Sequence, residues 1–141
     1  MLKEELIFPK PESVGERPWG EEILLALIEK KISLKILKIN KGEKGGLQYH
    51  RMKDECGYLI SGKLLVRYDL GDGKLREKII SKGESFHFFP GYAHQEEALE
   101  DCVIVEASTP HFNDRVRVEG KYGIKDKKGL PTTSIEDIIL K

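Results

Sequence analysis

The sequence predicts an all-β protein in which many short strands form a sandwich or a barrel. Three observations predict this class. Short apolar segments rich in β-branched residues follow one another at close spacing. Glycine-rich turns separate these segments. The length of 141 residues suits a single domain with one substantial core, and no internal repeat or low-complexity stretch interrupts the pattern.

Residues 1–20 are predicted to form an N-terminal arm. The segment contains three of the six prolines, and proline cannot donate a hydrogen bond to a sheet, so we expect it to be extended or looped over the body. Trp19 is the expected anchor of the arm, as an aromatic plug over a barrel end or in a subunit interface.

The barrel itself is predicted over residues 21–118. Residues 21–29 fit a buried strand or a helical turn, and the partly alternating segment Ile32–Ile39 decides for a hairpin with its tip at residues 29–31. A glycine-rich turn at residues 41–46 precedes a strand that carries Gln48 and His50. Further strands are predicted at Gly57–Ile60, Lys63–Leu70, Leu75–Ser81, Ser85–Phe89 and Cys102–Ala107.

Residues 119–141 are predicted to be a C-terminal tail. Ser134 has the character of a helix N-cap, with Asp137 three residues later, so a short helix is predicted at residues 134–140.

Charge and hydropathy narrow the class of partner. Lysine plus arginine and aspartate plus glutamate balance at 24 each, and there is no basic run, which argues against nucleic acid as the main partner. No apolar run approaches the roughly 20 residues of a membrane span. The first residues lack the pattern of a signal peptide, so we expect a cytoplasmic protein without a membrane partner.

Two segments, one hairpin apart, carry side chains of the metal-ligand type. They read Gly42-x5-Gln48-Tyr49-His50-x4-Glu55-x6-Gly62 and Gly83-x6-Pro90-Gly91-Tyr92-Ala93-His94. Gln48 and His50 are two residues apart and face the same way on a strand. Glu55 follows a short charged corner, and His94 follows a Pro-Gly turn. Two nitrogens, a carboxylate oxygen and an amide oxygen would then meet on one divalent metal and leave one or two positions open.

This spacing resembles the two signature motifs of the cupin superfamily, G(X)5HXH(X)3-4E(X)6G and G(X)5PXG(X)2H(X)3N. The resemblance implies a double-stranded β-helix, or jelly-roll barrel, and one divalent transition metal (Mn, Fe, Co, Ni or Zn) held by Gln48, His50, Glu55 and His94. Three positions depart from the motifs. Gln48 stands where the first ligating histidine would be, Pro90 is displaced by one residue, and Ala98 replaces the final asparagine. A neutral amide binds late transition metals more weakly than imidazole, which leaves open a barrel that binds no metal.

The flanking segments resemble phosphomannose-isomerase-like cupins. The matching segments are RPWG at 17–20, EASTP with DRVR between 106 and 117, and KYG at 121–123. Aldose–ketose isomerisation requires a Lewis acid on the substrate oxygens and a base that moves a proton between adjacent carbons. Glu106 is the candidate base, and Arg117 is the candidate that holds a phosphate or carboxylate. A rim ion pair without a catalytic role explains these two residues equally well.

The leading hypothesis is an enzyme, a metal-dependent sugar or sugar-phosphate isomerase or epimerase that works through a metal-stabilised enediolate. Its substrate partner would be a small carbohydrate. One alternative is a cupin that binds a sugar or nucleotide sugar without chemistry, and another is an Fe(II) dioxygenase, since two histidines and one glutamate also form a facial triad. Cupins commonly pair through their N-terminal strands, and an apolar strand edge needs covering, so we expect a homodimer.

Overall fold

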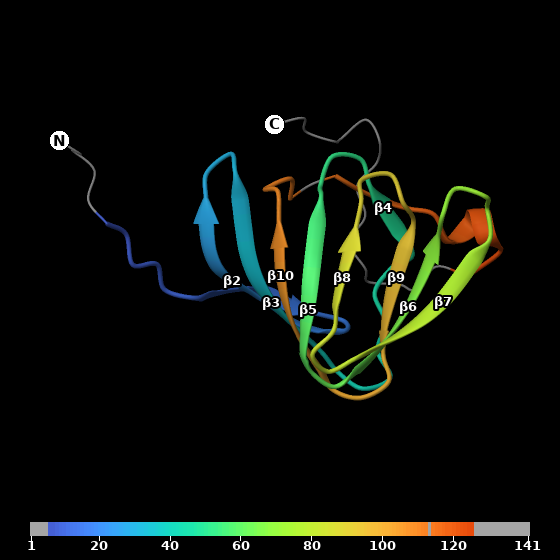
Figure 1. The fold of residues 1–141 in the computed structure, drawn as a ribbon, viewed down its shortest axis with the longest axis horizontal. Coiled ribbons are helices and arrows are strands. Elements are labelled where there is room, and N and C mark those ends of the chain that lie inside the picture. Colours follow the sequence, from blue (N-terminus) through green and yellow to red (C-terminus); the bar gives the residue numbers. More distant parts are fainter. Residues whose placement is uncertain (1–5, 113, 126–141) are drawn as a thin grey trace.

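The computed structural model describes residues 6–112 and 114–125, which form two packed antiparallel sheets (Figure 1). The first sheet has the order β1 (Glu12–Arg17), β2 (Gly20–Ile28), β3 (Ile32–Ile39), β10 (Cys102–Ser108), β5 (Glu55–Ser61) and β8 (Ser85–Phe88). The second has the order β11 (Arg115–Arg117), β4 (Gln48–His50), β9 (His94–Ala98), β6 (Lys63–Asp69) and β7 (Leu75–Ser81). This is a jelly-roll sandwich, and the all-β prediction is confirmed.

Each strand predicted from the sequence is present, with ends that differ by at most two residues. Strands β1, β9 and β11 were not predicted as strands. The sequence of β9, His-Gln-Glu-Glu-Ala, contains no β-branched residue, and β11 has only three residues. Strand β9 forms because β4 and β6 pair with it on its two sides. Tertiary pairing therefore overrides a weak local preference in this part of the second sheet.

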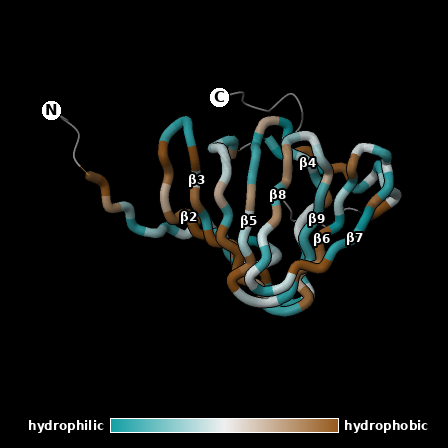
Figure 2. Tube along the Cα trace, in the orientation of Figure 1, coloured by the Kyte–Doolittle hydropathy of each residue, from teal (hydrophilic) through white to brown (hydrophobic). Residues whose placement is uncertain are grey.

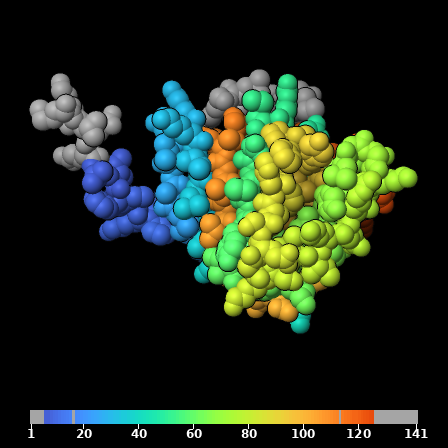
Figure 3. Space-filling view, in the orientation of Figure 1, coloured from blue at the N-terminus to red at the C-terminus, as the bar shows by residue number. Residues whose placement is uncertain are grey.

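The two terminal segments differ in how they join the body. The predicted arm contains β1, which pairs with β2, while Leu6, Ile7 and Phe8 remain 84–85% exposed. Figure 3 shows the blue N-terminal segment extending away from the sandwich. Trp19 packs against the edge of the apolar core. The described part of the tail begins with a 3-10 helix, η1 (Glu119–Tyr122), and the predicted helix at 134–140 lies outside the described residues. In the part of the chain that the structure describes, no helix has the length and apolar character needed to cross a membrane.

The apolar core occupies one end of the sandwich. Leu59, Leu64 and Ile104 are fully buried there, close to the connections between β5 and β6 and between β9 and β10. Figure 2 shows hydrophobic segments gathered at this lower end, where these connections meet. The buried residues toward the other end include several that are charged. The packing therefore stabilises one end of the sandwich and leaves space for a polar site at the other.

Gly62, the last glycine of the first motif, is required by a close approach of two backbone segments. Its φ is +94°, and a Cβ at this position would lie 2.3 Å from the carbonyl oxygen of Asp101. Glycine alone accommodates both the left-handed conformation and this contact. The turn joins β5 to β6 and so links the two sheets beneath the site.

Candidate metal centre and cavity

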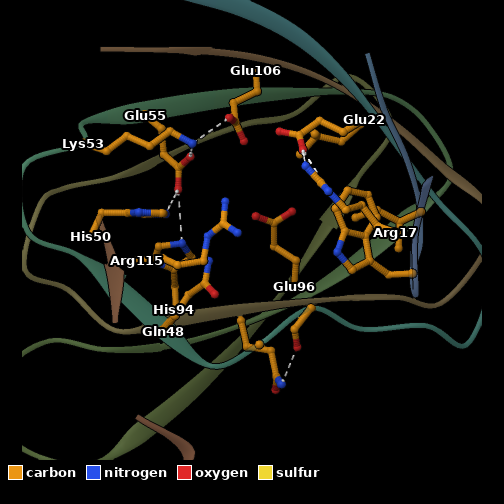
Figure 4. Close-up of a pocket in the computed structure, with 16 residues that line it drawn as sticks. Arg17, Glu22, Gln48, His50, Lys53, Glu55, His94, Glu96, Glu106 and Arg115 are labelled. Carbon is orange, nitrogen blue, oxygen red and sulfur yellow. Dashed lines mark hydrogen bonds and ion pairs between the residues drawn. The ribbon is translucent and has the colours of Figure 1, made fainter. Parts of the chain in front are cut away.

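The two sheets bring His50, Glu55 and His94 together at the polar end of the sandwich (Figure 4). His50 ends β4, His94 begins the neighbouring strand β9, and Glu55 begins β5 in the opposite sheet. One ligand atom from each residue lies within 4.8 Å of the others. All three residues are 4–5% exposed. The predicted convergence of these three side chains is therefore present in the fold.

Hydrogen bonds orient both imidazole rings toward Glu55. The Nδ1 atom of His50 lies 3.0 Å from Oδ1 of Asp114, and Nδ1 of His94 lies 3.1 Å from the carbonyl oxygen of Tyr92. An ionised carboxylate and a carbonyl can only accept, so each Nδ1 carries the hydrogen. Each Nε2 then points at Oε1 of Glu55, at 3.5 Å from His50 and 3.2 Å from His94.

This arrangement fits a divalent cation. When both imidazoles are neutral, the Nε2 atoms of His50 and His94 each direct a lone pair at Oε1 of Glu55, which is also an acceptor. These three acceptor atoms repel one another unless a proton or a metal ion lies between them. Ligands bound at about 2.0–2.2 Å from one metal lie roughly 3–3.5 Å from each other, which matches the two Nε2–Oε1 separations. A hydrogen bond on the second nitrogen of each ring is also the arrangement that metal-ligating histidines use.

The pKa values of the cluster residues reflect the same geometry. Burial lowers the pKa of His50 and outweighs the contributions of Asp114 and Glu55. Burial also lowers the pKa of His94, but the hydrogen bond and charge of Glu55 outweigh it and raise the pKa above its ordinary value. Burial raises the pKa of Glu55, yet Lys53 and the two histidines hold it well below its usual range. Glu55 is thus ionised, and its negative charge stabilises either the protonated form of His94 or a bound metal cation.

Gln48, the fourth predicted ligand, lines the same cavity. It is directly opposite His94 in the register of β4 and β9, and its side chain is half-buried. A Cβ on Gly46 would lie 3.2 Å from Oε1 of Gln48 and 2.8 Å from Nε of Arg117, so a larger residue there would require these side chains to shift. A role for the Gln48 amide on a metal stays a prediction.

Lys53 is a functional candidate that the sequence reasoning missed. Its Nζ donates to Oε2 of Glu55 at 2.9 Å and to Oε1 of Glu106 at 3.1 Å, and the residue is only 7% exposed. Burial lowers the pKa of Lys53, but the charges of Glu106 and Glu55 outweigh it and raise the pKa. The sequence reasoning missed Lys53 because it lies in a short charged segment of the kind that usually forms a solvated turn. Residues two apart on a strand face the same side, so its spacing from Glu55 could have indicated that Lys53 faces inward.

Two carboxyl groups in the cavity have raised pKa values. Burial and the charge of Glu55 raise the pKa of Glu106 to about 7, although Lys53 opposes the shift. Burial and the charges of Glu55 and Glu106 raise the pKa of Glu96 to about 8. Glu96 is two residues after His94 on β9 and shares its face, whereas the next residue, Glu97, turns outward to Arg67. Carboxyl groups that titrate near neutrality are suited to proton transfer.

Strands β1, β2 and β3 form the far wall of the cavity. Arg17 Nη2 and Lys35 Nζ each donate to the carboxylate of Glu22 at 2.8 Å. The two cations lower the pKa of Glu22 to about 2 although burial raises it. Trp19 also lines the cavity, whose volume is about 100 Å³. The RPWG segment was noted only for its resemblance, and its place in this wall was not predicted, because the charges of the wall come from three strands that meet only in the fold.

Glu106 and Arg117, the two residues predicted to support catalysis, lie in different places. Glu106 lines the cavity beside Lys53. Arg117 is on β11 and forms an ion pair with Glu119, and it is not among the described residues that line the cavity. Oε1 of Glu119 also accepts a hydrogen bond from the backbone nitrogen of Leu47 at 3.0 Å. This pair ties η1 to the segment that precedes β4.

Comparison with known proteins places the chain in a family. The family model described as a cupin domain matches residues 35–106, which include the whole His50–Glu55–His94 cluster. The chain belongs to the cupin domain family, and the predicted resemblance is confirmed at that level.

Solved structures with the same fold include three that differ in size. The capsular polysaccharide assembling protein CapF from Staphylococcus aureus matches with a TM-score of 0.67 and 19% identity, over 77% of this chain and 34% of CapF. KdgF from Halomonas sp. matches with a TM-score of 0.59 and 22% identity, over 72% of this chain and 88% of KdgF. An RmlC-like cupin from Shewanella frigidimarina matches with a TM-score of 0.61 and 19% identity, over 77% of this chain and 92% of that protein.

These similarities concern the fold. The matched part of CapF is about a third of that protein's length, 34%. The comparison with curated proteins found no match. The function must therefore be argued from the cavity of this chain and not from the activity of a relative.

Proposed function

We propose that the protein is a metal-dependent cupin that isomerises or epimerises a sugar or a sugar phosphate. The observation that carries the proposal is the His50–Glu55–His94 cluster in the wall of a cavity that also contains carboxyl groups with pKa values near neutrality. His50, Glu55 and His94 would hold the metal, with Gln48 as the candidate fourth ligand. When bound, the metal would supply a Lewis acid for adjacent oxygens of the substrate.

The residues of the chain would carry the proton. Isomerisation removes a proton from the carbon beside a carbonyl and returns it to the neighbouring carbon, through an enediolate. Glu106, with a pKa of about 7, has both the ionised form that accepts this proton and the protonated form that returns it. Lys53 would keep the carboxylate of Glu106 in place through its 3.1 Å contact. Glu96 is a second candidate for the same task, since it also lines the cavity.

The first experiment measures metal content by mass spectrometry for the wild-type protein and for His50→Ala and His94→Ala. We expect about one divalent metal per chain in the wild type and its loss in both variants. His87→Ala is the matched control, because His87 is exposed, pairs with Asp54 and does not line the cavity. Wild-type protein without metal after reconstitution with Mn, Fe, Co, Ni and Zn would refute the metal-dependent activity.

Turnover is then tested by solvent deuterium exchange. Aldoses and aldose phosphates are incubated in D2O with the reconstituted protein, and deuterium at C2 is followed by NMR. We expect incorporation with the wild-type protein and a loss of about 10²-fold or more with Glu106→Gln if this group is the base. Exchange that persists in Glu106→Gln but disappears in Glu96→Gln would assign the base to Glu96 instead.

A second candidate function is sugar binding without chemistry. The contact between Lys53 and Glu106 favours it, because a carboxylate held in a buried ion pair is less available as a base. Carbohydrate binding without deuterium exchange under any metal would support this function. An Fe(II) dioxygenase is the third candidate, since two histidines and one glutamate form the cluster. Substrate-dependent oxygen uptake with ferrous iron would single it out.

The protein is also proposed to be a homodimer. Leu6, Ile7 and Phe8 are 84–85% exposed, and β1 is an edge strand of the first sheet. Apolar side chains and an open strand edge of this kind are commonly covered by a second subunit. Light scattering at micromolar concentration that gives the mass of a single chain would refute the dimer.

A further inference from the structure

Among the described residues, Arg115 differs from the other cationic residues of the cavity in that no ion pair or hydrogen bond engages its guanidinium. Lys53 is bound to Glu55 and Glu106, and Arg17 is bound to Glu22. Within residues 6–112 and 114–125, by contrast, no side chain or backbone group forms a hydrogen bond or ion pair with the Arg115 guanidinium. The side chain nonetheless lines the cavity and is half-buried. A guanidinium presents a planar fork of donors that matches a carboxylate or a phosphate with two parallel hydrogen bonds.

The register of β11 places this guanidinium beside the metal cluster. Arg115 is directly opposite His50 across the β11–β4 pair, so the two backbones are separated by a single interstrand spacing. Figure 4 shows the guanidinium and the carboxylate of Glu96 both directed toward the centre of the cavity, with no interaction between the two groups. Arg117 is one pair further along, opposite Gln48, and is engaged by Glu119.

We infer that Arg115 binds a carboxylate of the substrate and that the substrate is therefore a sugar acid whose carboxylate lies close to the reacting carbonyl, as in a keto sugar acid. This inference rests on the proposed function and specifies its substrate. The anion would lie next to the metal ligands because Arg115 is paired with His50. The substrate oxygens bound at the cluster would then be only a few bonds from the carboxylate. A hydroxyl group of the same molecule would face Glu96.

The size of the cavity favours a carboxylate over a phosphate. Its volume is about 100 Å³, and much of its wall is already formed by charged side chains with partners of their own. A carboxylate is planar and matches the fork of a guanidinium with two parallel hydrogen bonds. In a hexose phosphate, the phosphate is separated from the reacting carbons by most of the sugar chain, so it would lie outside the region that Arg115 reaches.

The test is ligand binding by isothermal titration calorimetry with the full chain, loaded with the metal that it retains. The probes are glycolate, D-glycerate and D-gluconate. The neutral counterpart is sorbitol, and the phosphate counterpart is sorbitol 6-phosphate. The variants are Arg115→Gln and Arg115→Lys. Arg51→Gln is the matched control, because Arg51 is an exposed arginine one residue after His50 and does not line the cavity.

We expect at least one of the three acids to bind the wild-type protein more tightly than sorbitol. Arg115→Gln should weaken acid binding by about 10- to 100-fold, the contribution of a bidentate charge-assisted pair, and Arg115→Lys by less. Sorbitol binding and metal content should be unchanged in both variants, and Arg51→Gln should behave as the wild type. Because Arg115→Lys keeps the charge and most of the side-chain volume, it also provides a folded variant if Arg115→Gln is unstable.

Three results would overturn the inference. The first is that none of the acids binds more tightly than sorbitol. The second is that acid binding is the same in Arg115→Gln and in the wild type. The third is that sorbitol 6-phosphate binds more tightly than every acid and loses this advantage in Arg115→Gln, which would assign a phosphate to the site. Failure of the proposed isomerase activity gives a different pattern, in which Arg115-dependent acid binding remains and no deuterium exchange occurs.

Discussion

Replacement of Asp114 by asparagine should disturb the fold and the candidate metal centre together. The Asp114 side chain is buried, at 1% exposure, and its carboxylate accepts three hydrogen bonds. The donors are the backbone nitrogens of Met52 and Lys53, at 2.8 and 2.7 Å, and Nδ1 of His50, at 3.0 Å. The carboxylate thus holds the corner between β4 and β5 and also orients one proposed metal ligand.

The magnitude follows from these three hydrogen bonds. Asparagine keeps one acceptor oxygen and turns an NH₂ group toward donors, so at least one buried donor loses its acceptor at a cost of about 1–3 kcal/mol. The remaining hydrogen bonds also lose the strength that a charged acceptor gives. We therefore expect Asp114→Asn to lower the free energy of unfolding by about 2–4 kcal/mol, or the melting temperature by roughly 10 °C. Metal affinity should fall by about 10- to 100-fold, as is usual when the partner of a ligating histidine is removed.

Urea unfolding and metal titration against a competing chelator measure the two effects. Asp101→Asn is the matched control, because Asp101 also accepts a hydrogen bond from a backbone nitrogen, that of Lys41 at 2.7 Å, but is exposed and does not line the cavity. This control should cost less than about 1 kcal/mol and leave metal binding unchanged. The reasoning would be refuted by an Asp114→Asn protein that is as stable as the control and binds metal as the wild type does.

Three further predictions concern two motif positions, Gln48 and Gly62, and the carboxyl group of Glu96 in the cavity. Gln48→His should tighten Zn or Ni binding by roughly tenfold or more, because imidazole is a better ligand than a neutral amide, and unchanged affinity in chelator competition would show that position 48 does not reach the metal. Gly62→Ala should lower the free energy of unfolding by roughly 3 kcal/mol or more, because the new Cβ would clash with the backbone of Asp101 and alanine would also be held at a positive φ. Gly71→Ala, with φ +104° but open space around it, should cost only about 1–2 kcal/mol; equal losses in urea unfolding would contradict the steric argument. The pKa of Glu96 is raised to about 8 from 4.5, so the metal-free folded state binds its proton more tightly than the unfolded chain does. This stabilisation is complete below the unfolded pKa and is lost as pH rises through 8, so the unfolding free energy should fall between about pH 4.5 and pH 8 in the wild type and less steeply in Glu96→Gln.

Part of the cavity could be predicted from local sequence, and part could not. His50, Glu55 and His94 are adjacent to turns and on strands, so motif spacing and strand alternation predicted that they converge. Arg115 and Glu96 were harder to place. Strand β9 has little β-propensity and β11 has three residues, so nothing local indicated which side chains face inward. Their direction is set by pairing with β4 and β6.

The sequence by itself determined the all-β class, most of the strands and the cluster His50–Glu55–His94. These features depend on short-range chemistry, namely side-chain alternation, turn-forming glycines, and fixed spacing between ligands. Only the tertiary structure decided which charges share the cavity. Lys53 meets Glu106 across 53 residues of sequence, and Arg115 lies opposite His50 through strand pairing. Interactions between distant segments depend on sheet order and register, and no local pattern in the chain specifies these.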